Sequence, residues 1–199
     1  NPENFGYWFR AQGASSSLRD GSAAELVAPV ELSDKSYETE WVENKSGFGR
    51  GEFVTLKTSL GALPVTAIRL ALGHGAAPSD FNRPRRLGVI FDKKNQYWIE
   101  IPKDPKGEQW VVFPEPVSAD CVTLVIDDVY PRSASKAKRG RTAISEITVV
   151  TEHDMQPEDA GRLLATRVAE GRGGSDLGRL LGSLGPKAAP ALVAGIASS

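Results

Sequence analysis

Short segments that favour β-strands follow one another from Phe5 to about Thr151, and this series restricts the chain to β-rich folds. The segments are rich in valine, isoleucine, threonine and aromatic residues, and they alternate in part between apolar and polar positions. Turn-forming sequences such as SLGALP, FDKKNQ and PKDPKGE separate them. No long amphipathic helix lies between them, so parallel strands joined by helices are not expected. The pattern predicts an antiparallel β-sandwich or jelly roll. The predicted strand segments read YWFRAQGASS, GEFVTLKT, VTAIRLAL, RLGVIF, YWIEI, QWVVF, CVTLVID and AISEITVV.

The character of the sequence changes after His153. In QPEDAGRLLATRVAEG, Pro157 stands where the first residue of a helix is expected, acidic residues follow it, and Gly171 marks the end. Apolar residues between these limits recur at helical spacing. The segments SDLGRLLGSLG and PKAAPALVAGIASS predict two further helices. We therefore divide the chain into a sandwich over residues 1–152 and a helical segment over residues 153–199.

The two ends of the sequence indicate a longer protein. The chain begins at Asn1 without methionine, and its alanine-rich last segment stays apolar up to Ser199. None of the predicted helices could bury its apolar stripe alone, so each must pack on another helix, on the sandwich or on further sequence. We expect a processed or excised piece of a protein that continues beyond Ser199.

Composition excludes several classes of protein. The chain has 199 residues, a net charge of −1, 40% hydrophobic residues and 25% charged residues, which is not typical of a disordered chain. This balance gives no overall attraction to nucleic acid or to an anionic membrane, and no apolar run approaches the roughly 20 residues that span a bilayer. The single cysteine, Cys121, lies in the apolar run CVTLVI, where we expect a small buried side chain.

The glycine-rich stretch WVENKSGFGRGEF, from Trp41 to Phe53, raises the question of a phosphate-binding loop. Its spacing is G-x-G-x-G, whereas a dinucleotide fingerprint requires G-x-G-x-x-G between a strand and a helix. The sequence that follows, EFVTLKT, predicts a strand, so no helix N-terminus is present to receive a phosphate. We interpret the stretch as a turn that leads into a strand.

The same region resembles the discoidin, or coagulation-factor type C, family. The matching positions are Leu32, Asp34, Thr39 and Trp41, followed by Gly51-Glu52. Two later stretches, IRLALGHGAAPSDFNRPRRLGVIF and VIDDVYPRSASKAKRGRTAISEITVV, fit the next parts of the pattern in the right order. The resemblance extends over about residues 8–150 and implies a galactose-binding-like β-sandwich of the kind found in bacterial surface proteins. The later sequence LLGSLGPKAAPALVAGI resembles the beginning of a HEAT-type helical array, which needs stacked neighbours for stability.

Domains of this kind bind ligands at the loops of one end, and the long loop from Gly73 to Pro84 is the best candidate for recognition. It contains His74, Asn82 and Arg83. The alternative is a solvated loop in which Arg83 satisfies backbone carbonyl groups. Four aromatic residues are expected to be structural. The family's matching tryptophan usually packs inside, so the resemblance implies a core position for Trp41. Tyr130 should support a turn, and Trp98 and Trp110, which alternate with polar neighbours in strands, should be core or sheet-face residues.

A basic run extends from Pro131 to Arg141 and contains no acidic residue. Together with Arg83, Arg85 and Arg86 on the other loop, it would form an anion-attracting face if both loops lie at the same end. Such a face would suit a sulfated or acidic glycan, a phospholipid headgroup or an acidic partner, and the alternative is a flexible solubilising loop. The basic residues of the run are Arg132, Lys136, Lys138, Arg139 and Arg141. The predicted ligand-binding residues are His74, Asn82, Arg83, Arg85 and Arg139.

A calcium site is also implied by the resemblance, because some members of this superfamily are stabilised by Ca²⁺. It would place Asp34, Thr39 and Glu146 around the ion, with backbone carbonyl groups completing the oxygen ligands. The family usually has glycine after the first aspartate, and this chain has Lys35 there. The alternative is that Asp34 caps a turn, Thr39 hydrogen-bonds locally and Glu146 pairs with a base.

No catalytic motif is recognisable. The histidines are His74 and His153, and the sequence contains no G-x-S-x-G, no H-E-x-x-H and no cysteine cluster. We therefore expect a non-catalytic binding module that recognises carbohydrate or another surface ligand, without nucleic acid, in an extracytoplasmic protein. Two alternatives remain open. One is a protein-interaction scaffold formed by the sandwich and the helical segment, and the other is an accessory domain of a carbohydrate-active enzyme.

Overall fold

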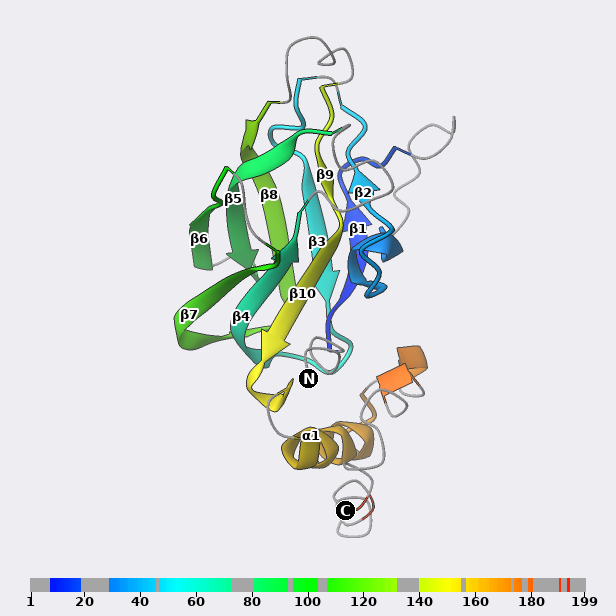
Figure 1. Ribbon diagram of the computed structural model, residues 1–199. Coiled ribbons are helices and arrows are strands. Elements are labelled where there is room, and N and C mark those ends of the chain that lie inside the picture. The colour runs from blue at the N-terminus through cyan, green and yellow to red at the C-terminus, as the bar shows by residue number, and fades with distance from the viewer. Residues whose placement is uncertain are drawn as a thin grey trace.

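Two antiparallel sheets that face each other form the body of the molecule in the computed structural model (Figure 1). The structure describes residues 8–18, 29–45, 47–72, 81–92, 95–103, 107–131, 140–154, 157–172, 174–176, 179–180, 190 and 193.

One sheet has five strands and the other has three, and all neighbouring strands pair antiparallel. The predicted antiparallel sandwich is therefore confirmed. A separate two-stranded pairing joins β2 (Trp41–Val42) to β9 (Ala143–Ile144). In spatial order, the five-stranded sheet consists of β1 (Arg10–Ala14), β3 (Phe53–Lys57), β8 (Cys121–Tyr130), β5 (Arg83–Phe91) and β6 (Asn95–Glu100). The three-stranded sheet consists of β10 (Glu146–Thr151), β4 (Leu63–Ala71) and β7 (Gln109–Ala119).

Apolar side chains that alternate along the strands fill the space between the two sheets. Leu87, Val89 and Phe91 of β5 face Ile68 and other side chains of the smaller sheet, and all of them are buried. Alternation places every second side chain of a strand on the same face, which is why the apolar residues gather on the inner faces. Buried aromatic contacts link the sheets, since the rings of Phe91 and Phe113 meet edge to face with centroids 5.2 Å apart.

A helix follows the last strand at one end of the sandwich (Figure 1). The short 3-10 turn η4 (Glu152–Asp154) leads to α1 (Pro157–Ala169), which begins at the proline predicted for that position. Gly171 follows the helix with a φ of 71°, a left-handed conformation that suits a helix end. Ala160 and Leu164 are buried and belong to the same apolar cluster as the strands, so α1 packs on the sandwich.

Two further 3-10 turns complete the described elements, η2 (Val30–Ser33) and η5 (Gly174–Asp176). Most of the two other predicted helices lies outside the described residues, and the HEAT-like array stays a prediction. Within the described parts of the chain, no helix is both long and apolar enough to cross a bilayer.

Trp41 lies in the core as predicted, whereas Trp98, Trp110 and Cys121 are more exposed than core residues. Trp41 is 1% exposed, and its indole N–H donates a hydrogen bond of 2.8 Å to the carbonyl oxygen of Ser16. Trp98 and Trp110 lie on sheet faces, but both are exposed and neither is a core residue. Cys121 is half-buried rather than buried, because it is the first residue of β8 and lies at the end of that strand. Desolvation raises the pKa of its thiol.

The glycine-rich stretch is a turn that leads into β3, as predicted. Gly47, Gly49 and Gly51 all have positive φ angles of 98°, 70° and 83°. The carboxylate of Glu43 lies inside this turn and accepts hydrogen bonds from the backbone N–H groups of Lys45, at 2.6 Å, and Thr142, at 3.0 Å. The glycines therefore let the backbone wrap closely around a buried carboxylate rather than around a phosphate.

Gly49→Ala should destabilise the protein more than any other alanine substitution in this turn. A Cβ atom at position 49 would lie 2.6 Å from Cγ of Glu43, so the buried carboxylate would be displaced from its two amide donors. We expect a loss of more than roughly 3 kcal/mol in the free energy of unfolding, measured by urea denaturation.

Gly47→Ala is the matched control, because its φ is also positive but no atom lies within 4 Å of the Cβ position. It should carry only the backbone strain of about 1–2 kcal/mol. Equal losses in the two variants would show that the contact with Glu43 is unimportant.

Candidate functional site

The ends of the two predicted recognition loops lie side by side at the end of the sandwich opposite α1 (Figure 1). The backbone of Asn82, directly before β5, makes both connections. Its N–H donates to the carbonyl oxygen of Arg141 at 2.8 Å, and its carbonyl oxygen accepts from the N–H of Ala143 at 3.2 Å. The predicted ligand residues His74 and Arg139 lie outside the described residues, as do residues 73–80 and 132–139 as a whole.

The prediction that Arg83, Arg85 and Arg86 belong to a loop is wrong, because all three lie on β5. The strand starts earlier than expected since its first residues pair with the last residues of β8, beginning with Arg83 opposite Tyr130. Two irregularities in the pairing, on either side of Arg86, accommodate Pro84 in the ladder.

These arginines have protein partners at the strand ends. The guanidinium of Arg83 donates to the carbonyl oxygen of Lys103, which matches the alternative interpretation of this residue. Arg85 forms an ion pair of 3.0 Å with Asp128, and Arg50 pairs with the same carboxylate. A hydrogen bond from the backbone of Val129, assisted by the two arginines, lowers the pKa of Asp128. One carboxylate thus orders two guanidinium groups that remain more than half exposed.

Two other predicted residues at this end are turned inward. Asn82 is 4% exposed, so its side chain is not available at the surface, and its backbone groups connect to residues 141 and 143. The hydroxyl group of Tyr130 donates to the carbonyl oxygen of Ile101 at 2.9 Å, which fits the structural role expected for it. The exposed groups of the described part of this end include several guanidinium groups, among them that of Arg86, which pairs with the carboxylates of Asp127 and Glu100.

The three side chains of the predicted calcium site are close together. Asp34 accepts hydrogen bonds from the N–H of Ser36, at 2.8 Å, and the hydroxyl group of Thr39, at 2.7 Å. Glu146, at the start of β10, accepts a hydrogen bond of 3.1 Å from the N–H of Lys35. No group of three or more histidine, cysteine, aspartate or glutamate side chains suited to a metal occurs in the described ranges, so an ion here would also need hydroxyl and backbone oxygens.

The charges around Glu146 are strongly perturbed. Glu146 is 3% exposed, and burial, together with the nearby charge of Asp34, raises the pKa of its carboxyl group to about 8. Burial and the charge of Arg69 lower the pKa of Lys35 to about 8. Lys35 also has a φ of 66°, the conformation for which the family's glycine is suited.

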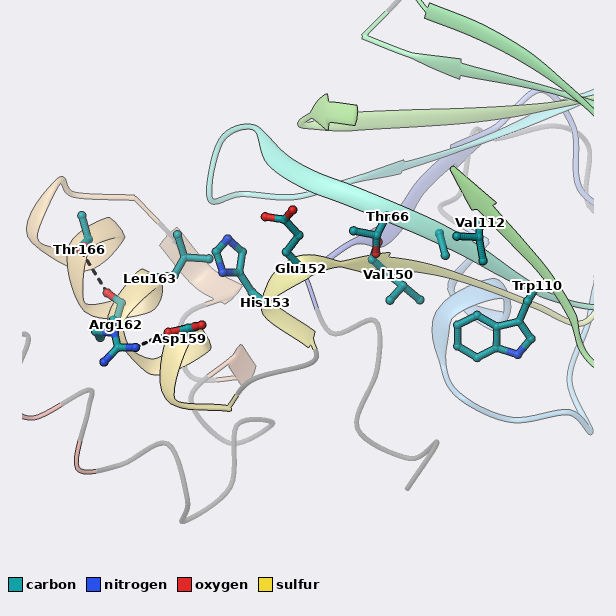
Figure 2. A pocket seen from close by; sticks show the side chains of 11 residues that line it. Thr66, Trp110, Val112, Val150, Glu152, His153, Asp159, Arg162, Leu163 and Thr166 are labelled. Atoms are coloured by element: carbon teal, nitrogen blue, oxygen red, sulfur yellow. Dashed lines mark hydrogen bonds and ion pairs between the residues drawn. The ribbon is translucent and has the colours of Figure 1, made fainter. Parts of the chain in front are cut away.

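A groove of about 840 Å³ lies at the other end of the molecule, between the outer face of the smaller sheet and α1 (Figure 2). Its strand side carries apolar residues and its helix side carries charged ones. Nothing in the sequence indicates it, because it forms only when α1 folds back against the strands. The lining residues are Thr66, Ala67, Trp110, Val112, Val150, Glu152, His153, Asp159, Arg162, Leu163 and Thr166.

His153 connects the groove to the core. Its imidazole meets the indole of Trp8 edge to face with centroids 6.4 Å apart, and desolvation lowers the pKa of the ring. A neutral imidazole is therefore favoured at pH 7.

A sandwich of these two sheets, with a glycine turn before β3, defines the class of discoidin-like, galactose-binding-like domains. Residues 8–150 match the family model described as the NAD glycohydrolase translocation F5/8 type C domain, and the chain belongs to this family. The expected discoidin-like resemblance is thus confirmed.

Solved structures with low sequence identity share the fold. CpGH89CBM32-5 from Clostridium perfringens, in complex with GalNAc-β-1,3-galactose, has 17% identity and a TM-score of 0.51, over 72% of this chain and 95% of that one. CBM32-1 from a family 31 glycoside hydrolase of the same organism has 10% identity and a TM-score of 0.51, over 76% and 100%. A variant of the lectin-binding domain of lectinolysin, in complex with Lewis b, has 13% identity and a TM-score of 0.50, over 72% and 92%. No curated protein matches the sequence.

The pH dependence of stability should change when Glu146 is replaced by glutamine. In the folded state the carboxyl group holds its proton up to about pH 8, whereas the unfolded chain releases it near 4.5. Stability therefore falls as the pH rises between these values, by at most about 1.4 kcal/mol per pH unit for this group. Lys35 acts in the opposite direction above pH 8, since its pKa returns from about 8 to 10.5 on unfolding.

Urea denaturation at pH 5, 6.5 and 8, in the presence of EDTA, tests this prediction. The wild type should lose stability across the series, and Glu146→Gln should lose less because the amide does not titrate. Parallel curves for the two proteins would contradict it.

Proposed function

We propose that this chain is a non-catalytic recognition module that binds carbohydrate through the loops at the Asn82–Ala143 end of the sandwich. The observation that carries the proposal is the pairing of Asn82 with residues 141–143, which brings the ends of both loops together. The fold supports it, because two structures that share this fold are carbohydrate complexes, one with GalNAc-β-1,3-galactose and one with Lewis b. Loops that a rigid scaffold holds close together are a common form of binding site.

We further propose that the preferred ligand is acidic, with sulfate or carboxylate groups. Arg50 and Arg85 are more than half exposed and are ordered by a shared carboxylate. The sequence of the neighbouring loop adds the basic run from Arg132 to Arg141 without any acidic residue. Guanidinium groups bind sulfate and carboxylate groups in a bidentate manner. Glu43 does not offset these charges at the surface, because its side chain is buried in the glycine turn.

A second candidate function comes from the family description, which associates these domains with translocation of an NAD glycohydrolase. It supports an accessory domain of a larger extracytoplasmic protein, in which the sandwich assists the delivery of another domain. The two candidates are compatible if carbohydrate binding holds the protein at a surface. If a variant keeps glycan binding but no longer assists the delivery of the other domain, the result would favour a protein-interaction scaffold instead.

Binding of acidic glycans should weaken when Arg85 is replaced by alanine. Sulfated and sialylated oligosaccharides, titrated by calorimetry against the full chain, should bind the variant roughly tenfold more weakly. Raising the salt concentration should weaken binding to the wild type more than to the variant, because exposed charges are screened. The double variant Arg85→Ala/Arg139→Ala should show a further loss if the basic run from Arg132 to Arg141 also contributes.

The matched control is Lys57→Ala, which removes one exposed positive charge from the opposite end of β3. It should leave acidic glycan binding unchanged. Equal losses in Arg85→Ala and Lys57→Ala would reduce the effect to net charge, and no binding of any acidic glycan by the wild type would refute the ligand class.

We also propose that Asp34, Thr39 and Glu146 hold a calcium ion. Their convergence supports the site, as does the raised pKa of the buried Glu146 carboxyl group, which a divalent cation would reverse. The ion would supply no reaction chemistry. It would tie the turn after η2 to the first residue of β10, and so fix one margin of the smaller sheet.

Lys35→Gly should strengthen calcium binding, since it removes a positive charge and the positive-φ strain from the site. Saturating CaCl₂ should raise the Tm of this variant by about 5–10 °C relative to EDTA in differential scanning fluorimetry, and that of the wild type by less. Glu146→Gln should abolish the effect in both backgrounds. A Tm that is the same in CaCl₂ and EDTA for all of these proteins would exclude calcium.

A further inference from the structure

The groove between the smaller sheet and α1 has the composition of a ligand site. Its volume of about 840 Å³ falls within the range of roughly 300–1,000 Å³ that is usual for small-molecule sites. The floor consists of Ala67 and Val150, which are buried, and Leu163 of α1 closes one side. In Figure 2 the groove extends from Trp110, on the strand side, to the charged side chains of α1.

Trp110 has the largest apolar side chain of the groove, and Arg69 of the neighbouring strand packs against its ring. It is 46% exposed, although it lies in register with Arg69 of β4. The guanidinium of Arg69 lies 5.9 Å from the centre of the indole ring and is itself fixed by Glu108, at 3.3 Å, and Thr148, at 3.1 Å. Val112, two residues further along β7, is 71% exposed on the same face. The strand therefore presents a fixed aromatic surface beside an aliphatic one, at a sheet margin where apolar exposure is unusual.

The opposite rim of the groove is polar but not positively charged. Glu152 of η4 is exposed, and the carboxylate of Asp159 is paired with Arg162 on the first turns of α1. The imidazole of His153 is neutral at pH 7, so the rim offers carboxylate, imidazole and hydroxyl groups without an excess of cations. An acidic ligand would meet Glu152 and Asp159, and a wholly apolar ligand would desolvate them without compensation.

We propose that this groove binds a neutral oligosaccharide, with one pyranose ring stacked on Trp110 and its hydroxyl groups directed to the Glu152 and Asp159 rim. A sugar ring has an apolar C–H face and a hydroxyl-bearing edge. The strand side of the groove would contact the C–H face, and the polar rim would bind the hydroxyl groups. The inference shares with the proposed function only the class of ligand, because its site lies at the other end of the sandwich. The chain would then carry two separate glycan sites, one for acidic and one for neutral ligands.

Titration of the full chain with neutral trisaccharides of galactose, glucose and N-acetylglucosamine, followed by calorimetry, tests the groove. Trp110→Ala should weaken binding of the best ligand by roughly tenfold or more, as for other aromatic anchors. Val112→Arg, at the most exposed position of the groove, should block it by bulk without affecting the core. Glu152→Gln should weaken binding several-fold, because a charged hydrogen-bond acceptor is replaced by a neutral one.

Trp98→Ala is the matched control, since Trp98 is 56% exposed on the outer face of the other sheet. It should leave neutral glycan binding unchanged, and so should Arg85→Ala, which tests the other end of the sandwich. The proposal is overturned if no neutral trisaccharide binds, or if Trp98→Ala and Trp110→Ala lose affinity equally. It is also overturned if only the apolar dye 1-anilinonaphthalene-8-sulfonate occupies the groove and no sugar competes with it.

Discussion

The short segment from Arg141 to Ala143 is held from two sides by main-chain hydrogen bonds. The arrangement of the end of the sandwich opposite α1 depends on this segment. Asn82 pairs with it on one side, and Glu43 pairs with Thr142 on the other through both its backbone N–H and its carboxylate. The buried carboxyl group accepts hydrogen bonds from two amide donors, which offset part of its desolvation, although burial still raises its pKa. Because the glycine turn wraps this carboxylate, one interaction fixes the turn before β3 and the ends of both recognition loops.

Local sequence was sufficient to predict the sandwich and the start of α1, but not the positions of the basic residues. Alternation and turn sequences report burial on one face of a strand, so the strand segments follow from them, whereas the core position of Trp41 was expected from the family resemblance. Arg83, Arg85 and Arg86 were predicted to lie on a loop. Their strand is extended by pairing with β8, and the sequence of β5 alone contains no record of that partner.

The groove, like the extension of β5, depends on contacts between segments that are distant in the sequence. Trp110 and Val112 alternate as expected for a strand face, and that pattern gives no indication that the face is left uncovered. Whether this strand face is covered depends on where α1 packs. The buried side chains of α1, Ala160 and Leu164, are typical of any amphipathic helix and do not indicate its position. A sequence motif could not have found the groove, since its residues come from three strands, a turn and a helix.

The distribution of charge differs between the two ends of the sandwich. At the loop end, a single carboxylate, Asp128, orders exposed guanidinium groups, so the surface field favours anions. At the α1 end, Arg162 is the only arginine among the described residues that line the groove, and its guanidinium is paired with Asp159, while Arg69 lies beside the indole of Trp110 and is 6% exposed. A net charge of −1 for the chain conceals this separation. If both proposed sites bind glycans, a glycan must be long enough to pass along the sandwich to occupy both, and such polymeric ligands would gain affinity that short ones do not.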